Sequence, residues 1–174
     1  MNPDPTLISN PFAVLSLIGA PAILTNAASV LAMSTSNRFL RASERMRALA
    51  ARLDSGAETE AVRAMLIVQV GRVERQAVLL LHGLGAAYVA LGSFASASLI
   101  SILGAALASS PFHAGALTAV ALALTAGIVG AGGLVTGCFN LFRATRLSML
   151  NIAEEAAMIR TRFENRRALS EADA

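Results

Sequence analysis

Two stretches without any Asp, Glu, Lys or Arg dominate the pattern of polar and apolar positions along the chain. Residues 5–37 form the first stretch, and residues 76–142 form the second. A helix needs about 20 apolar residues to cross a bilayer core of about 30 Å. The pattern therefore predicts a first membrane span at residues 11–36, and two further spans at residues 77–109 and 113–142.

The residues that flank these spans show helical periodicity of a different kind. Apolar side chains recur three and four positions apart at Phe39, Ala42, Met46, Leu49 and Leu53, and again at Met149, Ile152, Ala156, Ile159 and Phe163. Ser55 and Glu58 match a capping box, which would begin a helix that returns to the membrane. These patterns predict a helical hairpin at residues 37–76 and a last helix at residues 143–169.

Together the patterns predict an all-α integral membrane protein. Three transmembrane helices would extend into a cytoplasmic three-helix bundle, within one membrane domain over residues 1–174. Composition supports this fold class, because 55% of the residues are hydrophobic and 14% are charged, whereas soluble domains carry about 25% charged residues.

The arginines predict an orientation and a partner. All 14 basic residues are Arg, and they flank the spans. Since cytoplasmic loops attract positive charge, we expect the N-terminus outside and the C-terminus in the cytoplasm of a bacterial cell (inner) membrane. Anionic lipid headgroups would then face the arginines. Nucleic acid is not an expected partner, because 11 acids are interleaved with the arginines and no nucleic-acid motif is present.

Polar side chains gather in the inner half of the first span: Thr25, Asn26, Ser29, Ser36 and Asn37. Such a face serves either as a hydrogen-bonding contact between helices or as the lining of a water-filled path. Both alternatives stay open for this candidate polar face.

Small residues recur every fourth position in the other two spans. They are Ser93, Ala97, Ser101 and Ala105 on one helix, and Gly115, Ala119, Ala123 and Gly127 on the other. In lipid, close approach of backbones along small residues holds helices together, so these stripes predict a tightly packed pair. The glycines of residues 127–133 lack the spacing of a dinucleotide loop and indicate a closely packed or locally flexible transmembrane helix instead.

Counting residues outward from the membrane predicts which charges lie at one level. Glu74 falls level with Arg38 and Arg143, and Glu154 and Glu155 fall near Arg47, Arg52 and Arg63.

No catalytic chemistry is apparent in the sequence. Cys138 is the only cysteine, and no cluster of His, Cys and carboxylate residues or Ser-His pair is present. We therefore expect no enzyme activity, no catalytic residue, no cofactor and no metal site.

The segment after the first span carries a resemblance. Asn37-Arg38 is followed by Glu44-Arg45-Met46-Arg47-Ala48-Leu49, which resembles the Asp-Arg-x-Arg-x-Leu pattern of a family of small bacterial three-span inner-membrane proteins catalogued as a domain of unknown function. Glu44 stands where the family has Asp. The resemblance extends loosely to Arg72, Arg75 and Glu154 or Glu155. It implies a topology, but no substrate or catalytic residue.

Two functions agree with these features. The first is a non-catalytic, self-associating scaffold or interaction protein that offers its cytoplasmic bundle to a protein partner. The alternative is a homo-oligomeric ion channel whose first span lines the pore. Its cytoplasmic mouth, or the family motif, would comprise Arg38, Arg41, Glu44, Arg45 and Arg47.

Overall fold

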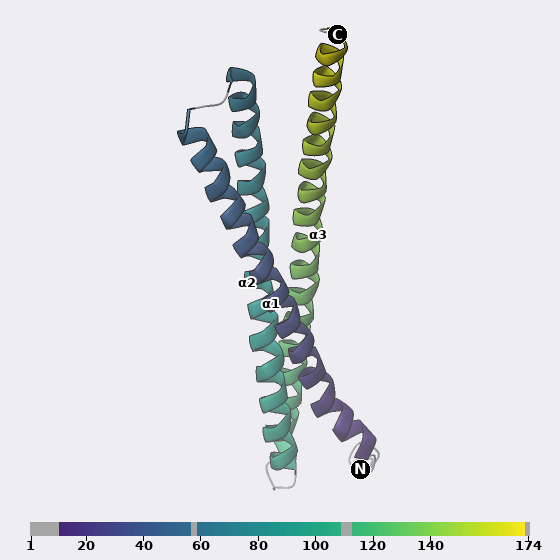
Figure 1. The fold of residues 1–174 in the computed structure, drawn as a ribbon. Helices are drawn as coiled ribbons and strands as arrows, with labels where there is room; N and C mark the ends of the chain where they lie inside the picture. Colours follow the sequence, from purple (N-terminus) through teal and green to yellow (C-terminus); the bar gives the residue numbers. More distant parts are fainter. Residues whose placement is uncertain (1–10, 57–58, 109–112, 173–174) are drawn as a thin grey trace. The chain divides into compact units, whose positions relative to one another are not determined.

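The computed structural model describes residues 11–56, 59–108 and 113–172, and all regular structure in these ranges is helical. Helix α1 spans Pro11–Asp54, α2 spans Glu60–Ala108 and α3 spans His113–Ala172 (Figure 1). The prediction of an all-helical chain with three long helices is confirmed. The predicted turn before the third span lies mostly at residues 109–112, which are outside the described ranges.

The turn after α1 differs from the prediction. The backbone N–H of Ser55 donates to the carbonyl of Ala51, and its hydroxyl donates to the carbonyl of Arg52. Ser55 therefore lies at the end of α1, and α2 begins only at Glu60. Glu58, the other member of the predicted capping box, lies outside the described residues. Gly56 follows with a φ of 63°, the left-handed conformation that ends many helices and that glycine adopts without strain. The carbonyl of Thr59 accepts the bond from Arg63 N–H and opens α2.

Buried residues follow a seven-residue repeat along each helix. Wherever the structure describes exposure, successive buried positions are three, four or seven residues apart. They are Ala28, Ala32, Thr35, Ala42 and Leu49 on α1; Leu66, Gln69, Val73, Leu80, Gly83, Ala87, Ala90, Phe94, Ala97, Ser101 and Gly104 on α2; and Ala119, Ala123, Gly130, Gly137, Ala144 and Asn151 on α3. A repeat of this kind is the signature of coiled-coil packing.

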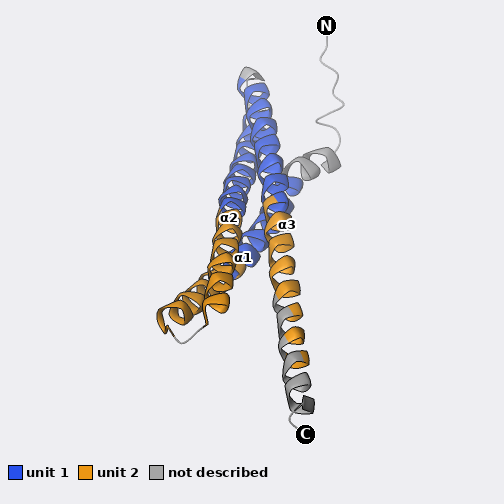
Figure 2. Cartoon of the chain, turned by 90° about the horizontal axis from the view of Figure 1, so that it is seen from above, with its two compact units in different colours: residues 1–37, 82–139 blue, residues 38–81, 140–174 orange. Residues whose placement is uncertain are grey.

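The contacts divide the chain into two compact units (Figure 2). Unit 1 comprises residues 1–37 and 82–139, and unit 2 comprises residues 38–81 and 140–174. Every arginine of the chain belongs to unit 2. The contact boundary thus follows the boundary between uncharged and charged sequence.

Unit 1 packs through small residues. Ala28, Ala90 and Phe94 form its core cluster. A Cβ atom on Gly133 would lie 2.9 Å from the carbonyl oxygen of Ala86, and one on Gly130 would lie 2.7 Å from the Phe94 ring. Only glycine therefore permits this approach of α2 and α3.

Unit 2 has larger side chains at most of its buried positions. Leu49, Leu66 and Val73 form one cluster, and Ala42, Leu80 and Ala144 form another. The apolar series predicted after the third span is wrong at the members whose exposure is described, because Met149, Ile152, Ala156 and Phe163 are exposed. The side chain of Ile159 lies outside the described residues. Among the described side chains beyond Ala144 on α3, Asn151 is the buried one, and a polar residue does not contribute to a pattern of apolar spacing.

Two helices contain stretches long and apolar enough to cross a membrane, within Glu60–Leu107 and Gly115–Glu154. Of the most apolar window in each, only 28% and 11% of the residues are buried. Their apolar side chains therefore face outward, unlike those of a core helix in a soluble domain.

Candidate functional site

A cavity lined by arginines lies within unit 2. Arg38, Arg41 and Arg45 line it from α1 and are spaced three and four residues apart, so they share one helix face. Opposite them lie Gln76 on α2, and Thr145 and Ser148 on α3. We call this space, of about 340 Å³, the arginine cavity.

The floor of the arginine cavity is apolar. Ala42, Leu80 and Ala144 line it, and these three residues form one of the buried clusters of unit 2. Above the floor, the Arg38 guanidinium donates to the Thr145 hydroxyl at 3.0 Å, and that hydroxyl donates to the carbonyl of Leu141 at 2.9 Å. Thr145 thereby holds Arg38 toward α3. None of the described residues that line the cavity is a carboxylate.

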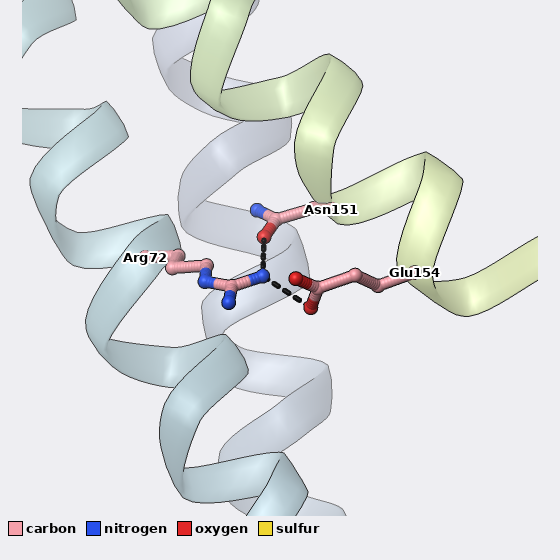
Figure 3. Close-up of polar contacts among 3 residues, drawn as sticks. All are labelled: Arg72, Asn151 and Glu154. Carbon is pink, nitrogen blue, oxygen red and sulfur yellow. Dashed lines mark hydrogen bonds and ion pairs between the residues drawn. The ribbon is translucent and has the colours of Figure 1, made fainter. Parts of the chain in front are cut away.

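A second polar cluster joins α2 to α3 in unit 2. Figure 3 shows the Arg72 guanidinium reaching Asn151 and Glu154, which are one helical turn apart. Its Nη1 atom lies 3.5 Å from Asn151 Oδ1 and also donates to Glu154 Oε2. The hydrogen bond to Glu154 raises the pKa of Arg72. Asn151 is buried, and its Nδ2 donor has no partner.

This pairing corrects the predicted register. The sequence placed Glu154 near Arg47, Arg52 and Arg63, but its partner is Arg72. The prediction assumed that the first arginine of each helix, counted from the membrane, lies at the same level, and this assumption is wrong. Ala42, Leu80 and Ala144 share a layer, and relative to it Arg38 and Arg143 lie on one side, whereas Arg75 lies five residues away on the other. Long arginine side chains let the first charge of a helix fall at different heights.

Not every residue of the predicted motif lines the cavity. Arg38, Arg41 and Arg45 do, whereas Glu44 and Arg47 are exposed and do not. Gln76, Thr145 and Ser148 were not among the predicted site residues. Gln76 alone had a positional signal, since it continues the spacing of three and four residues on α2 toward the buried Leu80.

Two of the five residues of the candidate polar face hydrogen-bond within α1 itself. The hydroxyls of Thr25 and Ser29 donate to the carbonyls four residues earlier, at 2.8 and 2.9 Å. Asn26 and Asn37 are exposed, and Ser36 is half-buried. Thr35, which was not among the predicted residues, is fully buried.

The small-residue stripes overlap the buried face only in part. Ala97, Ser101, Ala119 and Ala123 are buried, Ser93, Gly115 and Gly127 are half-buried, and Ala105 is exposed. A strict step of four residues advances by about 40° around a helix at each repeat. Residues spaced strictly four apart therefore rotate away from the helix–helix contact, whereas residues spaced alternately three and four apart stay in it.

The geometry holds no recognisable catalytic or metal constellation in the described residues. No group of three His, Cys, Asp or Glu residues in those ranges could hold a metal ion. Cys138 is exposed and free. The arrangement instead offers donors: guanidinium, amide and hydroxyl groups above an apolar floor.

Comparison with known proteins places the chain in a family. A family model described as "Protein of unknown function (DUF2721)" matches residues 18–153. The chain belongs to the DUF2721 family. No curated protein and no solved structure matches it.

The DUF2721 match covers segments from both units. It contains every residue that lines the arginine cavity, together with Arg72 and Asn151, whereas Glu154 lies one residue beyond it. The resemblance found in the sequence, to a domain of unknown function, is thus confirmed. The DUF2721 description assigns no activity to either cluster.

Proposed function

We propose that unit 1 lies in a bacterial inner membrane as three spans and that unit 2 lies in the cytoplasm. The supporting observation is the coincidence of two independent boundaries. Contacts divide the helices after Asn37, Leu81 and Phe139, and all arginines fall on the unit 2 side. Positive charge favours the cytoplasmic side, so the N-terminus would be outside and the C-terminus inside.

Exposed side chains support the membrane assignment of unit 1. Large apolar residues point away from its core, including Leu99, Leu117, Ile128 and Val135. In water such a surface would drive aggregation, whereas lipid solvates it.

The protein would act there as a non-catalytic, self-associating scaffold. Two exposed features would contact a second copy. Asn26 presents an amide away from its own chain, and an amide in hydrocarbon is costly unless it finds a hydrogen-bond partner. In unit 2, Met149, Ile152 and Phe163 present apolar side chains to the exterior. Unit 2 would offer the remaining surface to a protein partner.

The channel alternative uses the same first span differently. Several copies of Asn26 around an axis would line a pore, with Arg38 and Arg41 at its mouth. Because Thr25 and Ser29 already donate to their own helix, fewer polar groups are left for water, which favours the scaffold. Reconstituted protein in planar bilayers separates the two, since only the channel gives conductance that changes selectivity in Arg38→Glu.

Cysteine labelling tests the topology. In a Cys138→Ser background, single cysteines at Ser55, Ser110 and Ala168 are exposed to an impermeant thiol reagent in intact and opened cells. Position 110, outside the described residues, should react in intact cells, and positions 55 and 168 only after opening. Reaction of positions 55 and 110 from the same side would refute the three-span arrangement.

The self-association step has its own test. Asn26→Leu should weaken the oligomer by about 1 kcal/mol, because the interhelical hydrogen bond is lost, and Ser29→Ala is the matched control. Resonance energy transfer between labelled copies in liposomes measures the oligomer. Equal transfer in both variants would remove Asn26 from the contact.

A further inference from the structure

We propose that the arginine cavity binds a phosphate group, either the headgroup of an anionic phospholipid or a soluble phosphate. The lipid source rests on the proposed membrane location, whereas the phosphate chemistry rests on the cavity alone. Such a site would bind one phosphate group at a defined place, whereas arginines spread along a membrane surface attract anionic lipid in general.

The donor set favours phosphate. Arg38, Arg41 and Arg45 bring three guanidinium groups to one side of the cavity. A guanidinium is a planar fork of N–H donors that matches two oxygens of a phosphate. The hydroxyl of Ser148 and the amide of Gln76, on the other two helices, add neutral donors for the remaining oxygens.

The lining of the cavity carries positive charge. Among the described residues that line it there are three arginines and no carboxylate. Glu154 is engaged with Arg72, and Glu74 lines a different cavity together with Arg75 and Arg143. Arg38 donates to the neutral hydroxyl of Thr145, which orients its guanidinium without cancelling the charge. An anion entering here would meet the guanidinium groups of Arg38 and Arg41.

The size and depth of the cavity distinguish it from a flat basic surface. Its volume of about 340 Å³ is in the range of small-molecule sites, about 300–1,000 Å³. The buried floor of Ala42, Leu80 and Ala144 lowers the local dielectric, which strengthens each charge-assisted hydrogen bond. Basic pockets between helices on the cytoplasmic side of a membrane bind phospholipid headgroups in this way.

The experiment uses the full chain, purified in a neutral detergent and freed of lipid. One arm adds inorganic phosphate, and the other adds phosphatidylglycerol or, as reference, phosphatidylcholine in mixed micelles. Binding is followed by the rise in Tm and by native mass spectrometry of retained lipid. The wild type should bind phosphate, and a tighter response to phosphatidylglycerol than to phosphatidylcholine identifies the lipid as the source.

Matched variants locate the site. Arg38→Gln combined with Arg41→Gln should weaken binding at least about 10-fold, because two charge-assisted contacts are lost. Arg47→Gln, an exposed arginine of the same helix that does not line the cavity, should change binding less than about 2-fold. Circular dichroism and size exclusion establish that each variant is folded.

A variant that retains every charge tests the cavity itself. Ser148→Met fills the space without removing an arginine, and it should weaken binding as strongly as the double variant. If Arg47→Gln weakens binding as much, or if Ser148→Met has no effect, the ligand is held by diffuse charge and the inference is wrong. Absence of binding in both arms also overturns it. The phosphate arm contains no bilayer, so its result is independent of the labelling test of topology.

Discussion

The two units solve the same packing problem with different side chains. In both, buried positions are three, four or seven residues apart. Unit 1 fills most of them with small residues such as Ala28 and Ala90, with Phe94 as the large exception. Unit 2 fills most of them with larger side chains such as Leu49, Leu66 and Val73. In water, burying large apolar side chains supplies the free energy of folding. In lipid that drive is absent, and close backbone contact replaces it. Under the proposed membrane location of unit 1, the same repeat serves in lipid and in water.

The largest expected effect tests the large-residue core of unit 2. Leu66→Ala removes a side chain that is 4% exposed and should lower the free energy of unfolding by about 2–5 kcal/mol, because a cavity remains. Ile67→Ala is the control, since Ile67 is exposed. Chemical denaturation in detergent, followed by circular dichroism, gives both values. Similar losses would show that unit 2 does not depend on a buried core.

The next effect tests the close approach in unit 1. Gly133→Ala places a Cβ atom 2.9 Å from the carbonyl oxygen of Ala86, a backbone atom that cannot rotate away. We expect a loss of about 1–3 kcal/mol from overpacking. Gly132→Ala is the neighbouring control, with nothing within 4 Å of the added atom. A Tm that is unchanged in both variants would contradict the contact.

A smaller effect, of opposite sign, concerns the polar position in the core of unit 2. Asn151→Leu replaces an amide whose Nδ2 donor is buried without a partner. The free energy of unfolding should rise by about 1 kcal/mol, because that desolvation cost disappears. Ala153→Leu, at an exposed position of the same helix, controls for helix propensity. A destabilised Asn151→Leu variant would mean that the bond to Arg72 outweighs the unpaired donor.

The smallest effect concerns the pair of Arg72 and Glu154. Glu154→Gln should lower Tm by about 2 °C at most, because Glu154 is half exposed and solvent screens the pair. The hydrogen bond raises the pKa of Arg72, so its contribution is complete below the unfolded pKa and is lost only as the pH rises through the folded pKa. Between pH 6 and pH 9 the difference from wild type should therefore stay constant. A difference that grows between these pH values would assign it to another group.

The sequence was sufficient to predict three helices, because charge-free runs and apolar spacing act over tens of residues. It was insufficient for register. Counting from the first charge of each helix assumed that these charges lie at one level. Arg75 and Arg143 instead lie on opposite sides of the layer of Ala42, Leu80 and Ala144. It also misassigned the seam on α3, where the buried residue is Asn151 and the apolar neighbours Met149 and Ile152 are exposed.

The candidate site was predictable in part for a related reason. The arginines of α1 were visible as a motif, because they lie within eight residues of one another. Their neighbours Thr145 and Ser148 are about one hundred residues away, and only the packing of α1 against α3 within unit 2 brings them together. Local spacing carries no information about such partners.

The seven-residue repeat has a consequence for the register in which two helices pack. A helix displaced by seven residues, about 10.5 Å along its axis, would present the same succession of buried positions. A repeat made of alanines alone therefore does not select one register over another. Phe94 removes that ambiguity in unit 1, since its ring occupies the space that only Gly130 leaves open. The contact of Phe94 with Gly130 therefore selects one register of α2 against α3 among otherwise equivalent ones.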